Sequence, residues 1–126
     1  MTDAELLKLA AVAAGKPHEY NTFWNGLYIK RRDAIGEYWD SSSLWNPLNN
    51  NGDALELAVT LGLTVCTNCT DEYSAKFTAC FKYNDLGLEV CSVRQDHGDD
   101  ALAATRRAIV IAAAEIGKVE SPLATW

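Results

Sequence analysis

The chain has 126 residues, of which 48% are hydrophobic, 22% charged and 10% aromatic. This composition is typical of a globular protein, and the length supports one hydrophobic core with little room for a second. Eleven basic against seventeen acidic residues give a formal charge of -6, which disfavours binding to duplex DNA and to anionic membrane surfaces. We therefore expect a single domain over residues 1–126, with no direct duplex nucleic acid or membrane partner.

The N-terminal segment does not have the pattern of a signal peptide, because Asp3, Glu5 and Lys8 interrupt its apolar residues. The longest apolar run, Ala108–Ala114, is far too short to span a bilayer. We expect a cytoplasmic protein, and cysteines in that compartment are usually reduced.

The first predicted element is a helix. Thr2 and Glu5 have capping-box spacing, and the Leu- and Ala-rich stretch after them stops at Gly15. Between residues 18 and 47, alternation at Gly26–Lys30 and a return segment at Glu37–Asp40 predict a short β-hairpin.

A second helix is predicted after the Asn-rich loop at residues 49–52, with Asn50 or Asn51 as its cap and Gly62 as its end. The spacing of the apolar residues predicts the side that it buries. That side comprises Ala54, Leu55, Leu57, Ala58 and Leu61.

From Leu63 the hydrophobic period changes to two, which predicts a three-stranded antiparallel meander. The runs are Leu63–Cys69, Ala75–Tyr83 and Leu88–Gln95. A four-residue loop at 84–87 would place Cys80 opposite Cys91. In that register the core side would carry Ala79, Phe81 and Tyr83, and the other side would be mixed and partly polar.

The last predicted helix starts near Asp99 or Asp100 and ends at Gly117, which leaves residues 118–126 as a tail. Its inner stripe is expected to comprise Leu102, Thr105, Ile109, Ala112, Ala113 and Ile116. Together the elements predict an α+β fold: a sandwich-like antiparallel meander packed with about three helices, in the order α-β-β-α-β-β-β-α.

All four cysteines, Cys66, Cys69, Cys80 and Cys91, fall within one short stretch. The CxxC at 66–69 lacks the second close pair of a zinc ribbon and the following helix of a redox CxxC motif. We therefore favour structural cysteines over a zinc or redox role, while a cross-strand disulfide between Cys80 and Cys91 would require an oxidising environment.

The segment Asp96–Asp100 concentrates a histidine and three carboxylates, which could form a weak divalent-metal site or an acid–base pair. Helix capping is the favoured explanation, because carboxylates stabilise a helix N-terminus. The sequence contains no recognised catalytic or nucleotide-binding motif. We therefore expect no catalytic residues, no bound metal and no cofactor.

Residues 20–48 are rich in aromatic side chains and contain the basic triplet 30–32. Such residues could stack a base and pair with a phosphate, or form a protein interface. The candidate binding residues are Trp24, Tyr28, Arg31, Arg32, Trp39 and Trp45. The alternative is that Trp24 and Trp45 fill the edge of the core while the basic triplet lies in a solvated turn.

Two blocks of the sequence have a recognisable order of motifs. The first is Trp45–Leu48 followed by Gly52–Val59 and Leu61–Leu63, and the second is Asp100–Val110 followed by Ala113–Gly117. In this order they resemble the phage α-β-α (ABA) sandwich domain family of small bacteriophage and prophage proteins. The resemblance implies a phage-derived protein in the cytoplasm of a bacterial host, and it supplies no catalytic residues. The aromatic segment near residues 36–43 and the four cysteines are not features of that family.

The leading hypothesis is a phage accessory protein that binds and neutralises a host protein, a component of antiviral defence. Sequestration of a small nucleotide signalling ligand by the aromatic and basic segment is the second hypothesis. A structural phage protein without a ligand and a weak metal-dependent hydrolase at Asp96–Asp100 are further alternatives. An exposed aromatic patch would also be compatible with a homo-oligomer.

Overall fold

A computed structural model describes residues 2–15, 18–21, 26–32 and 36–120. The three helices are α1 (Asp3–Ala13), α2 (Asn51–Leu61) and α3 (Ala101–Glu120). The strands are β1 (His18–Asn21), β2 (Gly26–Arg32), β3 (Glu37–Trp45), β4 (Thr64–Thr70), β5 (Lys76–Tyr83) and β6 (Glu89–Asp96). They form two antiparallel three-stranded sheets, β1-β2-β3 and β4-β5-β6.

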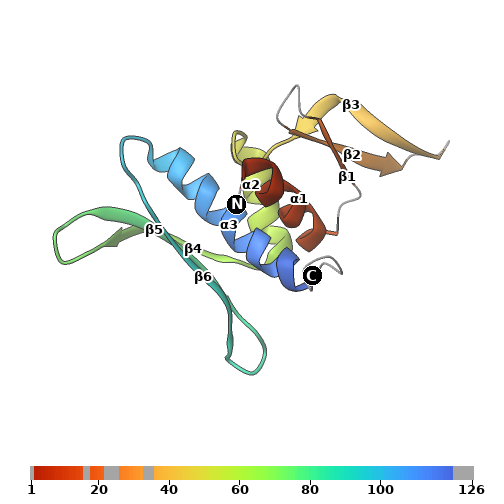
Figure 1. Cartoon of the computed structure of the whole chain (residues 1–126). Helices are drawn as coiled ribbons and strands as arrows, with labels where there is room; N and C mark the ends of the chain where they lie inside the picture. Colours follow the sequence, from red (N-terminus) through yellow and green to blue (C-terminus); the bar gives the residue numbers. More distant parts are fainter. Residues whose placement is uncertain (1, 16–17, 22–25, 33–35, 121–126) are drawn as a thin grey trace.

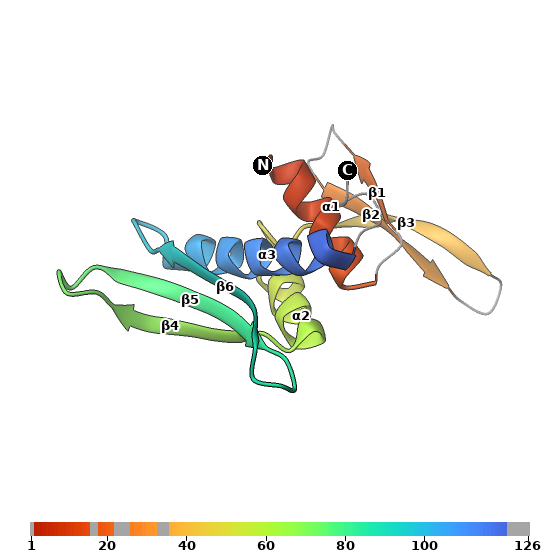
Figure 2. The ribbon, with the colours of Figure 1, turned by 60° about the horizontal axis from the view of Figure 1, so that its bottom comes forward.

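The helices lie between the two sheets, with α1 toward the first sheet and α3 against the second (Figures 1 and 2). The α+β class and the rough order of the elements are confirmed. One strand, β1, was not predicted, so the expected hairpin is a three-stranded sheet. This layer order differs from the helix–sheet–helix order in the name of the α-β-α family.

The ends of α1 and α2 are fixed by the predicted caps. The Glu5 backbone N–H donates to Thr2 Oγ1 at 3.2 Å, and the Thr2 N–H donates to Glu5 Oε2 at 3.1 Å, which completes the capping box. On α2, Asn50 accepts from the Asp53 N–H at 2.9 Å, and Gly62 ends the helix with a φ of 64°.

The core forms where the alanine-rich α3 packs between α1 and the second sheet. Small residues permit this close approach, and Ala108, Ala112 and Ala113 are fully buried. Four residues of the predicted inner stripe, Ile109, Ala112, Ala113 and Ile116, are buried. The other residues of the core are Leu6, Leu7, Ala10, Ala11, Leu27, Trp45, Ala54, Leu57, Ala58, Leu61, Cys80, Cys91, Val110 and Ala114.

Three helix predictions are wrong in detail. Leu55 is 65% exposed and Leu102 is 63% exposed, because each lies on the solvent side of its helix. The last helix also continues past Gly117 to Glu120, so residues 118–120 are helical and not part of a tail. Gly117 does not end the helix, because its backbone keeps the helical conformation and does not adopt the left-handed one of a capping glycine.

The three runs of the meander are confirmed to within one residue at each end, but the predicted register and core side are wrong. Cys80 pairs with Val93, and Cys91 pairs with Lys82, because the loop between β5 and β6 has five residues, one more than predicted, and β6 has an irregularity near its start. The buried side chains of β5 are Thr78 and Cys80, both 0% exposed. The alanine-rich face of α3 packs closely on small side chains, so it covers the small residues and leaves the aromatic ones outside.

None of the helices in the described part of the chain combines the length and the apolar character that a membrane span requires.

Candidate functional site on the open face of the second sheet

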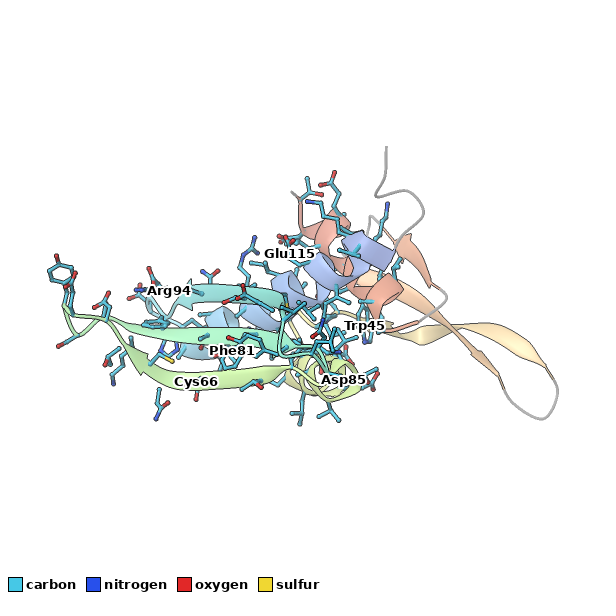
Figure 3. The ribbon with its side chains drawn as sticks, turned by 90° about the horizontal axis from the view of Figure 1, so that it is seen from below. Trp45, Cys66, Phe81, Asp85, Arg94 and Glu115 are labelled. Atoms are coloured by element: carbon cyan, nitrogen blue, oxygen red, sulfur yellow. The ribbon has the colours of Figure 1, made fainter. Side chains whose placement is uncertain are left out.

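One face of the second sheet is covered by α3 (Figure 3). Within the described part of the chain, no helix and no strand of the first sheet covers the other face. Cross-strand pairing arranges the uncovered face in three rows. The rows are Thr64–Phe81–Ser92, Cys66–Ala79–Arg94 and Cys69–Phe77–Asp96. We call these residues, together with Tyr83, the open face.

Aromatic side chains line the open face along β5. Phe77 and Phe81 are half-buried, and Tyr83 is 56% exposed. The Phe81 and Tyr83 rings meet edge to face, with their centroids 5.8 Å apart and their planes at 63°. This stripe was assigned to the core from its hydrophobicity, so sequence reasoning missed it as a candidate site.

Arg94 adds a fixed positive charge to the stripe. Its guanidinium carbon lies 4.0 Å from the centroid of the Phe77 ring, the geometry of a cation–π contact. Its Nη2 donates to Asp71 Oδ2 and its Nε donates to Asp96 Oδ1, each at 3.1 Å. These exposed ion pairs add little stability, but they hold the guanidinium over the ring.

Arg94 and Asp71 each shift the pKa of the other in the direction that favours its charged form. The hydrogen bond from Arg94 to Asp71 raises the pKa of the guanidinium above its usual value. The Asp71 carboxylate also accepts the backbone N–H groups of Ala75 at 2.9 Å and Tyr73 at 2.8 Å. The hydrogen bond from the Ala75 N–H, together with Arg94, lowers the pKa of Asp71 below its usual value. The Asp71 carboxylate and the Arg94 guanidinium therefore both stay charged at neutral pH.

The CxxC pair lies on the same open face. A bulge in β4 between Cys66 and Cys69 brings their Sγ atoms to 3.0 Å, and both thiols are free and half-buried. Cys80 and Cys91 are buried free thiols that do not lie directly opposite one another, so the predicted facing pair is absent. Among the described residues, no group of three or more His, Cys, Asp or Glu side chains is arranged to hold a metal ion.

The aromatic segment of residues 20–48 is described only in part. Trp24 lies outside the described residues. Tyr28, Arg31 and Arg32 lie on β2 and Trp39 on β3, where the backbone pairing is described but their side chains are not. Binding of a nucleotide by these residues therefore stays a prediction.

Trp45 is the one candidate of that segment whose side chain is described, and it belongs to the core. It is 4% exposed and pairs across the first sheet with Leu27, which is 0% exposed. The expectation that a tryptophan of this segment fills the core edge is confirmed for Trp45.

The segment Asp96–Asp100 caps α3, as the favoured explanation predicts. The Asp100 carboxylate accepts the Ala103 N–H at 2.9 Å. The same segment borders a shallow depression of about 550 Å³. Its lining residues are Ser74, Ala75, Lys76, Asp96, His97, Gly98, Asp99 and Ala101.

His97 faces inward to a buried hydroxyl. Its Nε2 lies 2.9 Å from Thr78 Oγ1, which in turn lies 2.8 Å from Thr105 Oγ1. This chain of hydrogen bonds joins the loop after β6, the centre of β5 and the first half of α3. The arrangement gives His97 a structural role in docking α3 on the sheet.

Replacing Thr78 by valine is expected to lower the free energy of unfolding by about 1–2 kcal/mol, because the hydroxyl partners of His97 and Thr105 are lost at a buried position. Urea unfolding followed by circular dichroism measures the change. Thr105→Val and the double variant complete a cycle, in which the double variant costs less than the sum. Strict additivity would show that the two hydroxyl groups are not coupled.

Comparison of the chain with protein-family models, with curated proteins and with solved structures finds no match.

Proposed function

We propose that this chain is a non-catalytic phage accessory protein that binds and neutralises a host protein, a component of antiviral defence in the bacterial cytoplasm, and that the open face is its contact surface. The phage origin is supported by the resemblance of two sequence blocks to the phage α-β-α family, and not by the order of the layers. The binding role is supported by the second sheet.

The observation that carries the binding role is which face of the second sheet its aromatic side chains occupy. Its larger apolar side chains, Phe77 and Phe81, lie on the open face, whereas the small Thr78 and Cys80 lie in the core. Aromatic residues and arginine dominate the binding energy of many protein interfaces. A partner that covered this face would remove that aromatic surface from water.

The loops at both ends of the sheet extend the apolar surface. In the β5–β6 loop, Leu86 is 84% exposed and Leu88 is 61% exposed, and Val90 at the start of β6 is 42% exposed. At the β4–β5 turn, Tyr73 is 83% exposed. Apolar side chains that gather at the ends of one sheet, next to its aromatic stripe, are typical of an interaction surface.

The chemistry of the open face favours a protein over a nucleic acid. The formal charge of the chain is -6, and Arg94 is already paired with two carboxylates. Phosphate groups would therefore have to displace Asp71 and Asp96. A sheet face of this kind also suits the broad surface of a protein better than a small ligand, which usually binds in a concave pocket.

The test compares two variants that each remove one large apolar side chain. Phe81→Ser alters the open face, and Leu55→Ser alters the exposed side of α2. With each variant as bait in bacterial lysate, we expect Phe81→Ser to reduce enrichment of the captured host protein at least about tenfold, as for an interface hot spot. The Leu55→Ser bait is expected to match the wild type.

Neutralisation is tested in cells. Expression of the wild type in bacteria that carry a defence system targeting the infecting phage is expected to restore plaque formation, and Phe81→Ser is expected to abolish this rescue. Equal capture by both variants would contradict the assignment of the open face. Failure of the wild type to restore plaques against every defence system tried, or a dimer in light scattering that Phe81→Ser dissociates, would contradict the host-protein role.

A further inference from the structure

Cys66 and Cys69 are brought together by the β-bulge in β4. Residues three apart in a regular strand point to opposite faces, because side chains alternate with a period of two. Here Cys66 pairs with Ala79 and Cys69 pairs with Phe77, so β4 has one more residue than β5 between the two pairs. The extra residue resets the alternation and places both thiols on the open face.

The two thiols are already in contact. The Cys69 Sγ donates to the Cys66 Sγ at 3.0 Å, and the Cys66 Sγ donates to Asn68 Oδ1 at 3.3 Å. The contact needs no movement of the backbone to bring the sulfur atoms together. β4 is also an edge strand of its sheet, and the intervening Thr67 and Asn68 are exposed, so a small reagent can reach the pair.

We propose that Cys66 and Cys69 form a redox-active dithiol, which reacts with small-molecule disulfides of the glutathione class and closes into an intramolecular disulfide. This inference does not depend on the proposed function. It differs from the sequence-based preference for structural cysteines, because the bulge replaces the helix that usually positions a CxxC pair.

The reaction is a balanced thiol–disulfide exchange. The Cys66 thiolate attacks one sulfur of the small disulfide, a mixed disulfide forms at Cys66, and one small thiol leaves. The Cys69 sulfur then attacks Cys66 Sγ, closes the Cys66–Cys69 bond and releases the second small thiol. The protein loses two electrons and two protons, and the small disulfide gains them.

The order of attack follows from the hydrogen bond between the two thiols. The Cys69 thiol donates a hydrogen bond to Cys66 Sγ, and this bond raises the pKa of Cys69 above its usual value. A thiol with a raised pKa is less often present as the thiolate, so Cys69 is the poorer first nucleophile and the first attack is assigned to Cys66. Arg94 lies in the same cross-strand row as Cys66, two strands away.

The other two cysteines provide an internal control. Burial raises the pKa of Cys80 to about 12 and also raises the pKa of Cys91. Both are inside the core, where a small disulfide has no access, so they are expected to remain reduced thiols.

The test uses the wild-type chain, incubated with excess oxidised glutathione, quenched in acid and alkylated after unfolding. We expect the alkylation count to fall from four to two, relative to the four cysteines of the reduced chain. Trypsin then separates the cysteines, since Cys66 and Cys69 share the peptide 33–76, while Cys80 and Cys91 lie in peptides 77–82 and 83–94. Peptide 33–76 is expected to be lighter by two hydrogen atoms and to remain unalkylated.

Single-cysteine variants separate the two steps. Cys69→Ser retains the first nucleophile and is expected to accumulate a stable glutathione adduct at Cys66, whereas Cys66→Ser is expected to react more slowly. Circular dichroism before and after oxidation confirms that each variant is folded. Full alkylation of peptide 33–76 in the folded wild type, glutathione adducts without ring closure, or a disulfide that joins peptides 77–82 and 83–94 would overturn the proposal.

Discussion

Replacing Gly117 by alanine is expected to destabilise the protein, although alanine is the better helix former by about 1 kcal/mol. A Cβ atom at this position in α3 would lie 2.8 Å from the carbonyl carbon of Leu9 and still closer to its oxygen. It would also lie 3.3 Å from the backbone nitrogen of Ala13. Because these atoms belong to the backbone of α1, the helices must move apart to accommodate the methyl group.

The expected loss is about 2–3 kcal/mol for Gly117→Ala and more for Gly117→Val, as for other overpacked sites. Urea unfolding followed by circular dichroism measures both values. Val119→Ala is the matched control in the same turn of α3, because Val119 is 84% exposed and its truncation is expected to change stability by less than about 0.5 kcal/mol. If Gly117→Ala were as stable as the wild type or more stable, the close crossing of α1 and α3 would be wrong.

The crossing explains why the end of α3 was mispredicted. A glycine after an alanine-rich stretch usually marks the end of a helix, because it adopts a left-handed conformation there. Gly62 and Gly15 do so, with φ values of 64° and 68°. Gly117 instead remains helical and is buried because α1 lies against it, and no local pattern distinguishes a capping glycine from one selected by a neighbouring helix.

The local features of the fold were predictable from the sequence. Thr2 with Glu5, Asn50 and Asp100 cap helices through hydrogen bonds within three residues, so the sequence alone contains both partners. The three runs of the meander follow from alternation, which is also local. The face that each strand buries is not local, because it depends on which neighbour packs against it.

The open face was missed for that reason. A hydrophobicity rule assigns Phe81 and Tyr83 to the core, since they are the larger apolar residues. The alanine-rich face of α3 instead selects the small side chains of Thr78 and Cys80. The Cys66–Cys69 contact was missed because the bulge shows only in the strand pairing and not in the sequence. A CxxC in a regular strand would point its two thiols to opposite faces.

Replacing Trp45 by alanine is expected to lower the free energy of unfolding by about 3–5 kcal/mol, as for other buried tryptophans. Its ring is 4% exposed at the end of β3, directly before the Pro47 turn and α2. It pairs with Leu27, which is fully buried, so these two residues anchor the first sheet to the core. Truncation would leave a cavity where that sheet meets the helices.

Leu86→Ala is the control, because Leu86 is 84% exposed and its truncation is expected to cost less than about 0.5 kcal/mol. Urea unfolding followed by circular dichroism applies to both variants, since the loss of Trp45 also changes the fluorescence. The comparison separates the two roles considered for the aromatic segment. A tryptophan that serves only a binding site can be removed without loss of stability, so a Trp45→Ala chain as stable as the wild type would contradict its place in the core.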